Sequence, residues 1–278
     1  MRSVIFCLLI FLPLAAQAET VIGLTAPLTG SYAAFGEQLK RGAEQAAQDL
    51  GGIKLRIADD ACDPKQAVAV ANQMASEGVR YVIGNFCSGA TLAASKVYME
   101  NEIVVITLAA NPRITDDAKT FMFRINGRSD EHGPVIARAM AARHAGREIA
   151  LLNDKTSYGR GLADEVKKAL NAAGVQEAVF ESYNAGERDY RALVSGLKER
   201  GVKALFVGGY HAETALIARQ MADSGMKAQI YSGPALMSRE FLSIAGESGG
   251  KCAGAVRHRS ARQSRRCGSG RALAGAGL

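Results

Sequence analysis

Short apolar runs alternate with longer amphipathic segments along most of this chain. The short runs have the length and residue types of β-strands. Between most of them, apolar residues recur at the spacing of one helix face, as in Ala67, Val70, Ala71 and Met74. This alternation predicts an α/β protein with parallel sheets flanked by helices on both faces. The predicted strands lie at residues 21–28, 53–59, 81–86, 104–110, 148–154, 177–183, 203–209 and 229–233.

The pattern breaks in a polar, glycine-containing stretch over residues 123–134. Four predicted strands precede this stretch, and a second series begins at about Ile149. We therefore expect two Rossmann-like lobes, at residues 19–127 and 128–250, with the chain crossing between them near residues 124–129. Ligands of open α/β sheets bind beyond the carboxyl ends of the strands, so these loops are where a site is expected.

The first residues have the layout of a cleavable secretory signal. Arg2 is followed by an apolar run shorter than the roughly 20 residues of a membrane span, and then by small residues that end at Ala18. We expect residues 1–18 to be cleaved after Ala18 and the protein to be periplasmic. A buried N-terminal helix is the alternative.

The formal net charge of +7 is unevenly distributed. Of the 34 Lys and Arg, seven lie in residues 251–278, which contain no acid, and another is Arg2. The remaining 26 nearly balance the 27 Asp and Glu, all of which lie in residues 19–250. No basic stripe typical of a nucleic-acid-binding domain is present, so no nucleic-acid partner is expected.

Hydroxyl and small residues follow two strands of the first predicted lobe. Ser88 and Thr91 begin a predicted helix, where two hydroxyls and free N–H groups suit an anion such as a carboxylate. The alternative is that Ser88 only caps the helix. After the next strand, Ala109 and Asn111 either leave room for a ligand backbone or form an ordinary turn.

Aromatic residues lie on three further loops. Tyr158 and Tyr210 follow strands of the second predicted lobe, and Phe35 follows the first strand of the chain. Each either covers an apolar ligand or packs on its own lobe. Together with the hydroxyl residues, they surround one predicted cleft.

Two cysteines, Cys62 and Cys87, follow strands that we expect to be neighbours. In an oxidising compartment these residues are expected to form a disulfide that holds the rim of the cleft. Two buried thiols are the alternative. The bridge would hold the loop that carries Ser88 and Thr91.

Motifs typical of enzymes are missing from the sequence. Residues 211–215 (HAETA) lack the second histidine of a zinc-binding helix, and neither a G-x-S-x-G elbow nor a glycine-rich phosphate loop occurs. Neither Ser88 nor Cys87 has an identifiable base. We therefore expect no catalysis, no metal and no cofactor.

Several stretches resemble the periplasmic leucine/isoleucine/valine-binding proteins of ABC importers. The resemblance covers about residues 20–250 and is carried by residues 59–91, 106–111, 154–166, 185–190 and 207–213. It implies a type I periplasmic binding fold, in which two α/β lobes joined by three crossing strands close on one amino acid. It also implies the Cys62–Cys87 disulfide, an inner-membrane ABC permease as partner, and a monomer.

Carried over residue by residue, the resemblance assigns binding of the ligand carboxylate to Ser88. It assigns further contacts to Ala109 and Asn111, and closure from the second lobe to Tyr158 and Tyr210. Phe35 matches an aromatic residue that covers the ligand.

One position departs from the family pattern. The family usually places an acid after the last of these strands, to pair with the ligand's α-ammonium group, whereas Pro234 or Ala235 stands there in this chain. Burying an unpaired ammonium group is costly. Either Glu213 or Glu240 therefore substitutes, or the ligand is an amide or organic acid instead of an α-amino acid.

Residues 251–278 resemble nothing in the family. We expect an aberrant basic tail from a shifted reading frame, and therefore an incomplete second lobe and return segment. A genuine disordered tail that binds an anionic surface is the alternative. The expected function is amino-acid binding for an ABC importer. A ligand-sensing receptor domain and a non-functional remnant are the alternatives, because one fold serves several functions.

Overall fold

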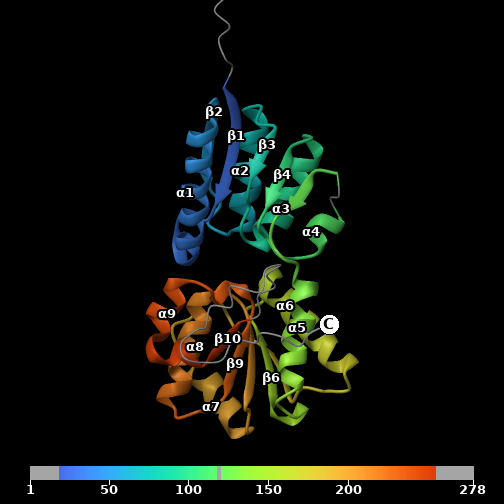
Figure 1. Cartoon of the computed structure of the whole chain (residues 1–278), viewed down its shortest axis with the longest axis vertical. Coiled ribbons are helices and arrows are strands. Elements are labelled where there is room, and N and C mark those ends of the chain that lie inside the picture. Colours follow the sequence, from blue (N-terminus) through green and yellow to red (C-terminus); the bar gives the residue numbers. More distant parts are fainter. Residues whose placement is uncertain (1–18, 118–119, 255–278) are drawn as a thin grey trace, which may run out of the picture.

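The computed structural model describes residues 19–117 and 120–254. They form two α/β lobes, one above the other in Figure 1, each built on a five-stranded parallel sheet. The predicted class, two lobes of parallel sheet flanked by helices, is confirmed by this topology. The predicted signal peptide at residues 1–18 and the segment 255–278 lie outside the described residues.

The first lobe contains the amino-terminal half of the described chain. Its strands are β1 (Thr20–Ala26), β2 (Ile53–Asp59), β3 (Tyr81–Ile83), β4 (Val104–Thr107) and β5 (Met122–Arg124), in the spatial order β2-β1-β3-β4-β5. Its helices are α1 (Ala33–Leu50), α2 (Pro64–Ser76), α3 (Ser88–Glu100) and α4 (Arg113–Asp116), and a 3-10 turn, η1 (Gly30–Tyr32), precedes α1.

Local sequence explains where helix α2 begins and which face it buries. The Asp63 carboxylate accepts a hydrogen bond from the Gln66 N–H at 2.8 Å, and Pro64 occupies the first helical turn, where its missing N–H costs nothing. The apolar face predicted from the sequence is confirmed, because its four residues are the buried residues of the helix.

The second lobe follows the same plan. Its strands are β6 (Ile149–Asn153), β7 (Val179–Ser182), β8 (Ala204–Gly208), β9 (Gln229–Ser232) and β10 (Cys252–Gly254), in the order β10-β9-β8-β6-β7. Its helices are α5 (Ser129–Ala141), α6 (Ser157–Ala172), α7 (Arg191–Glu199), α8 (His211–Asp223) and α9 (Arg239–Ala245), with 3-10 turns η2 (Gly146–Glu148), η3 (Pro234–Leu236) and η4 (Gly246–Lys251). Every residue of the central strands β6 and β8 is buried, as expected for a parallel sheet covered on both faces.

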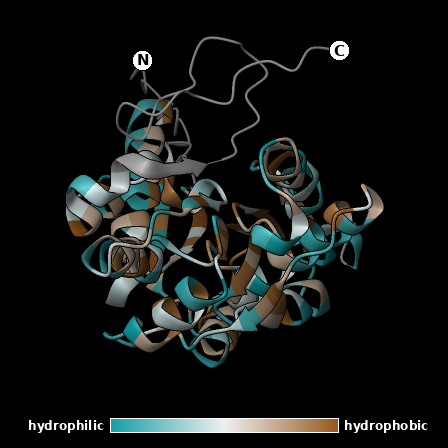
Figure 2. Cartoon of the chain, turned by 90° about the horizontal axis from the view of Figure 1, so that it is seen from below, coloured by the Kyte–Doolittle hydropathy of each residue, from teal (hydrophilic) through white to brown (hydrophobic). Residues whose placement is uncertain are grey.

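The helices bury apolar side chains against the sheets. In Figure 2, hydrophobic positions gather on the strands near the middle of the view, whereas hydrophilic positions are common on the outer helix faces. Within residues 19–117 and 120–254, no helix has both the length and the apolar character needed to cross a membrane.

Two sequence-based expectations about elements are wrong. The stretch 123–134, expected to be a linker, contains the end of β5 and the start of α5, so the first sheet has a fifth strand. Strand β5 is only three residues long and Phe123 is half exposed, which leaves little hydrophobic pattern to detect. The chain then crosses to the second lobe over residues 125–128.

The beginning of the expected tail is also ordered. Residues Cys252–Gly254 pair with β9 as a parallel strand, so the boundary placed before residue 251 is wrong. Backbone hydrogen bonding to the edge of a sheet does not require an amphipathic pattern, and these small residues show none. The rest of the predicted tail lies outside the described residues.

Candidate functional site

Loops that follow strands of the two sheets meet at the boundary between the lobes. The Asn111 side-chain amide, after β4, donates a hydrogen bond to the Ser157 carbonyl oxygen, after β6, at 2.9 Å. The Tyr32 ring of the first lobe lies 4.5 Å from the Tyr210 ring of the second, between ring centroids. This boundary is where the sequence predicted a cleft, at the carboxyl ends of the strands.

Ser88 lies at this boundary, at the amino-terminal end of α3. Its side chain is 1% exposed and does not cap the helix, since the N-cap residue is Cys87. The Ser88 hydroxyl oxygen instead accepts a hydrogen bond from the Asn111 N–H at 3.3 Å. The Ser88 backbone also interacts with the Tyr210 hydroxyl, so the start of α3 directly contacts the second lobe.

Thr91 is placed differently. Its hydroxyl donates to the Cys87 carbonyl oxygen at 2.9 Å and lies 3.4 Å from the Asn85 carbonyl oxygen, and the residue is fully buried. The Thr91 hydroxyl therefore serves the loop inside the first lobe, whereas Ser88 reaches the boundary.

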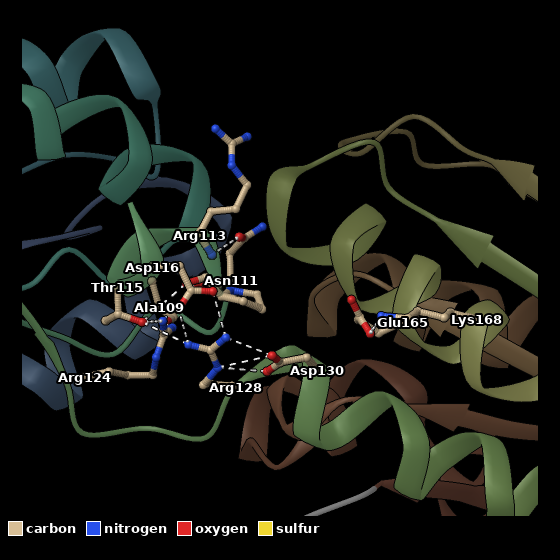
Figure 3. Close-up of polar contacts among 11 residues, drawn as sticks. Ala109, Asn111, Arg113, Thr115, Asp116, Arg124, Arg128, Asp130, Glu165 and Lys168 are labelled. Carbon is tan, nitrogen blue, oxygen red and sulfur yellow. Dashed lines mark hydrogen bonds and ion pairs between the residues drawn. The ribbon is translucent and has the colours of Figure 1, made fainter. Parts of the chain in front are cut away.

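A guanidinium group holds the loop after β4 (Figure 3). Arg124, at the end of β5, donates to the carbonyl oxygens of Ala109 and Asn111, the latter at 3.0 Å, and to the Thr115 hydroxyl at 2.9 Å. Burial, followed by the nearby Arg128, lowers the pKa of Arg124. The two predicted binding residues of this loop are thus positioned by a cation at the end of β5, directly before the crossing segment.

Aromatic rings from both lobes pack on one another at the boundary. We call Tyr32, Phe35, Phe86, Tyr158, Tyr210 and His211 the aromatic cluster. Phe35 stacks on Phe86 at 4.7 Å and meets the His211 ring edge-on at 4.9 Å, both between centroids. The ring centroids of Tyr210 and Tyr158 lie 4.9 Å apart. The three aromatic residues predicted from the sequence therefore lie in a single cluster that spans the lobes.

Cys62 and Cys87 form a disulfide, with their α-carbons 5.4 Å apart. The sequence suggested that the two preceding strands are neighbours. This prediction is wrong, because β1 lies between β2 and β3 in the sheet. The loop after β2 reaches past β1 to make the bond. Cys87 directly precedes α3, so the disulfide anchors the start of the helix that carries Ser88.

Buried acids lie in the second lobe close to the aromatic cluster. Asp154, after β6, is 3% exposed, and Glu213, in the first turn of α8, is 4% exposed. Pro234 and Ala235, where the family places an acid, begin the 3-10 turn η3 instead. Among the described residues, no group of three or more His, Cys, Asp and Glu side chains is arranged to hold a metal ion.

Burial dominates the electrostatics of this region. It raises the pKa of Asp154 to about 6, and the nearby Glu213 carboxylate contributes in the same direction. Burial also raises the pKa values of Tyr32, Tyr158 and Tyr210, so these phenols are neutral hydrogen-bonding groups at physiological pH. Burial lowers the pKa of His211, which favours the neutral imidazole.

Sequence reasoning missed several of these residues. Asp154 ends the apolar run of β6, so the strand-end rule that selected other residues applies to it equally. Phe86 directly precedes Cys87, and Tyr32 lies just before Phe35. No local signal distinguishes Arg124, whose role depends on contacts with the loop after β4.

Known proteins resemble this chain over most of its length. The model of the periplasmic binding protein family matches residues 19–259. The Leu/Ile/Val-binding protein homolog 2 of Brucella abortus (strain 2308) is 44% identical over 253 residues, which cover 88% of this chain and 68% of that protein. An amino acid binding protein of Pseudomonas aeruginosa is 41% identical over 241 residues, which cover 83% of this chain and 64% of that protein.

Solved structures share the fold. The crystal structure of the leucine binding protein LivK from Thermotoga maritima superposes with a TM-score of 0.76 at 26% identity, covering 83% of this chain and 67% of that one. The chain thus spans about two thirds of the length of these relatives. Since the family model matches most of the sequence and the two-lobed parallel topology agrees with it, this chain belongs to the periplasmic binding protein family.

Proposed function

We propose that this chain is a periplasmic solute-binding protein that delivers a branched-chain or related amino acid to an ABC importer. Relatives named as Leu/Ile/Val-binding and amino acid binding proteins support the ligand class. The observation that carries the proposal is the contact between predicted binding residues across the lobes, where Asn111 bonds to Ser157 and the Ser88 backbone meets Tyr210.

The start of α3 supplies the group that recognises the ligand carboxylate. The first N–H groups of a helix have no partner within the helix, and the positive end of the helix dipole favours an anion there. The Ser88 hydroxyl adds a donor at the same place. With the disulfide immediately before the helix, these donors are preorganised, which reduces the entropy lost on binding.

The aromatic cluster supplies the apolar part of the site. Its rings come from both lobes, so a ligand side chain between them is enclosed only when the lobes are closed. Tyr158 and Tyr210 belong to the second lobe, and Phe35 to the first. Binding therefore links occupancy of the site to lobe closure, the signal that an inner-membrane permease recognises. We propose that the protein acts as a monomer and requires no cofactor.

Calorimetric titration of the chain with leucine, isoleucine and valine tests this function. We expect saturable binding of at least one of them, and an approximately tenfold or greater loss in Ser88→Ala. Ser95→Ala is the matched control, because Ser95 lies on the same helix and its hydroxyl, within the described part of the chain, bonds only to the Leu92 carbonyl oxygen, at 2.9 Å. A folded chain that binds none of the three amino acids contradicts the proposal.

A further inference from the structure

We propose that Arg128 is a positioning residue that holds the two lobes at the angle seen in the structure. Its guanidinium group pairs with Asp116 of the first lobe and with Asp130 of the second (Figure 3). We call these three residues the clamp. The inference goes beyond the proposed function, because it concerns the arrangement of the lobes and is tested first without any ligand.

The pairing with the first lobe uses two nitrogens of the guanidinium group. Asp116 is the last residue of α4. Arg128 Nη1 donates a hydrogen bond to Asp116 Oδ1 at 2.9 Å, and Nη2 donates to Oδ2 at 3.0 Å. Nη1 also donates to the Thr115 hydroxyl oxygen at 3.2 Å. Such a bidentate pair fixes the direction of approach as well as the distance.

The pairing with the second lobe is bidentate as well. Asp130 lies in the first turn of α5, where the positive end of the helix dipole also favours a carboxylate. Arg128 Nε donates to Asp130 Oδ1 at 2.9 Å, and Nη2 donates to Oδ2 at 2.8 Å. One guanidinium group therefore joins a carboxylate from each lobe.

The start of α5 is attached to both lobes. A β-carbon added to Gly133 would lie 2.6 Å from the Glu165 β-carbon, so this part of α5 packs directly on α6 of the second lobe. The Ser129 N–H donates to the Ala110 carbonyl oxygen of the first lobe at 2.9 Å. The clamp thus acts where the two lobes come closest along the chain.

The position of the clamp makes it sensitive to the angle between the lobes. Within residues 19–117 and 120–254, the chain crosses between the lobes once, over residues 125–128. A rotation of the lobes about this segment changes the separation of Asp116 and Asp130. A single planar guanidinium group cannot then keep both bidentate pairs.

The charges of the clamp depend on one another. Hydrogen bonds from Arg128 lower the pKa of Asp130, and Asp130, followed by Asp116, raises the pKa of Arg128. All three groups are partly exposed, at 29% for Arg128, 52% for Asp116 and 34% for Asp130. An isolated exposed pair contributes little, whereas a bidentate network of several charges contributes more. Without the cation, the two carboxylates repel each other across the boundary between the lobes.

Small-angle scattering of variants without ligand tests the clamp. In Arg128→Gln we expect a larger radius of gyration than in the wild type at low ionic strength, because repulsion between the carboxylates replaces attraction. Adding Asp116→Asn removes the repulsion, so the radius of gyration of the double variant should return toward the wild-type value. A role of Arg128 in local packing alone predicts no such compensation.

Arg191→Gln is the matched control. Arg191 forms a bidentate pair with Asp189, at 2.9 Å from Nε to Oδ1 and 2.6 Å from Nη2 to Oδ2, but both residues belong to the second lobe. The substitution changes the net charge equally and should leave the radius of gyration unchanged. Urea denaturation of each variant shows that it is folded.

Ionic strength provides a second measurement, which needs no comparison between variants of unequal stability. The screening length falls from about 30 Å at 0.01 M salt to about 3 Å at 1 M. Added salt screens the attraction in the wild type, so its radius of gyration, extrapolated to zero protein concentration, should increase. In Arg128→Gln salt screens the repulsion, and the radius of gyration should decrease.

The outcomes separate the inference from the proposed function. Equal scattering of Arg128→Gln and Arg191→Gln, or a response to salt of the same sign in the wild type and Arg128→Gln, overturns the clamp. If the clamp and the proposed function both hold, Arg128→Gln also weakens leucine binding about fivefold, because the closed arrangement is less populated. A wild type that binds no amino acid, but shows the expected scattering, contradicts the proposed function alone.

Discussion

The Arg124 guanidinium donates a hydrogen bond to the Asn111 carbonyl oxygen at 3.0 Å. Arg124 ends the last strand of the first sheet, directly before the chain crosses between the lobes, whereas Asn111 belongs to the loop that contacts the second lobe. The crossing segment and the proposed binding loop are therefore mechanically connected. We expect a change in the direction of the crossing segment to reach Asn111 through this bond and the bond to Ala109.

Removing the guanidinium should disturb both stability and binding. In Arg124→Gln three donors to Ala109, Asn111 and Thr115 are lost, and we expect the free energy of unfolding to fall by about 3 kcal/mol, because charge-assisted hydrogen bonds contribute most when partly buried. Leucine affinity should fall as well. Urea denaturation and calorimetry measure the two effects.

Arg113→Gln is the control for that substitution. Arg113 pairs with Asp117 at 3.2 Å on an exposed helix face, and such pairs contribute little. Equal effects of the two substitutions would contradict the positioning role of Arg124.

The disulfide should stabilise the first lobe mainly through the unfolded chain. Cys62 and Cys87 are separated by 25 positions, and in the chain-entropy model a loop of this length corresponds to about 3 kcal/mol. Reduction with dithiothreitol is expected to lower the urea midpoint by a corresponding amount. The double variant Cys62→Ala/Cys87→Ala should show the low midpoint with or without reductant. A midpoint that reductant lowers equally in the double variant would exclude the bridge as the cause.

Burial of Asp154 should make stability depend on pH in an unusual direction. Its folded-state pKa of about 6 lies above the ordinary value of 3.8, so the folded state binds the proton more tightly than the unfolded state. The resulting stabilisation, about 3 kcal/mol in total, is fully present only below the unfolded-state pKa of 3.8 and is lost as the pH rises through 6.

Comparison with Asp154→Asn isolates this contribution from those of other groups. Without ligand, the difference in unfolding free energy between wild type and variant should change by about 2.4 kcal/mol between pH 4 and pH 7.5, in favour of the variant at the higher pH. Chemical denaturation at several pH values measures it. A constant difference across this range would show that the Asp154 pKa is not raised.

The hydrogen bond between Asn111 and Ser157 should favour the closed arrangement of the lobes. Asn111→Ala removes this bond, and a loss of about 1 kcal/mol would weaken amino-acid binding roughly fivefold. Small-angle scattering without ligand should show a larger radius of gyration. Asn72→Ala is the control, because the Asn72 side chain, among the residues that the structure describes, bonds only to the Val68 carbonyl oxygen within α2. Identical scattering and affinity for the Asn111 and Asn72 variants would show that the bond does not influence closure.

Many helices and strands of the fold could be predicted from the local pattern of apolar and polar residues. The helix face of α2 repeats at the period of an α-helix, and the strands β6 and β8 are continuous apolar runs. Such signals depend on residues close in sequence, because side-chain period and capping are set within one or two turns. Strand β5 was not predicted, because its three residues, one buried, one half exposed and one partly buried, contain too little pattern.

The residues of the candidate site could be predicted only in part from the sequence. Ser88, Asn111, Tyr158 and Tyr210 follow strand ends, so the topological rule selected them, and the structure places them at one boundary. The strand-end rule applies to Asp154 as well, whereas the contacts of Arg124 depend on which loops meet, and no local pattern specifies this. The order of β2, β1 and β3 was mistaken for the same reason.

The sequence by itself determined that this chain forms two α/β lobes of the periplasmic binding family, because periodicity and motifs are properties of the chain read in order. Only the tertiary structure decided which polar atoms are left without partners once the lobes pack. Whether Asp154 Oδ2 or Glu213 Oε2 finds a donor depends on residues that are distant in sequence. The order of the neighbouring strands β8, β6 and β7 in the second sheet decides which of these residues lie nearby. Burial then decides their chemistry, because a carboxylate removed from water must find a cation or a proton.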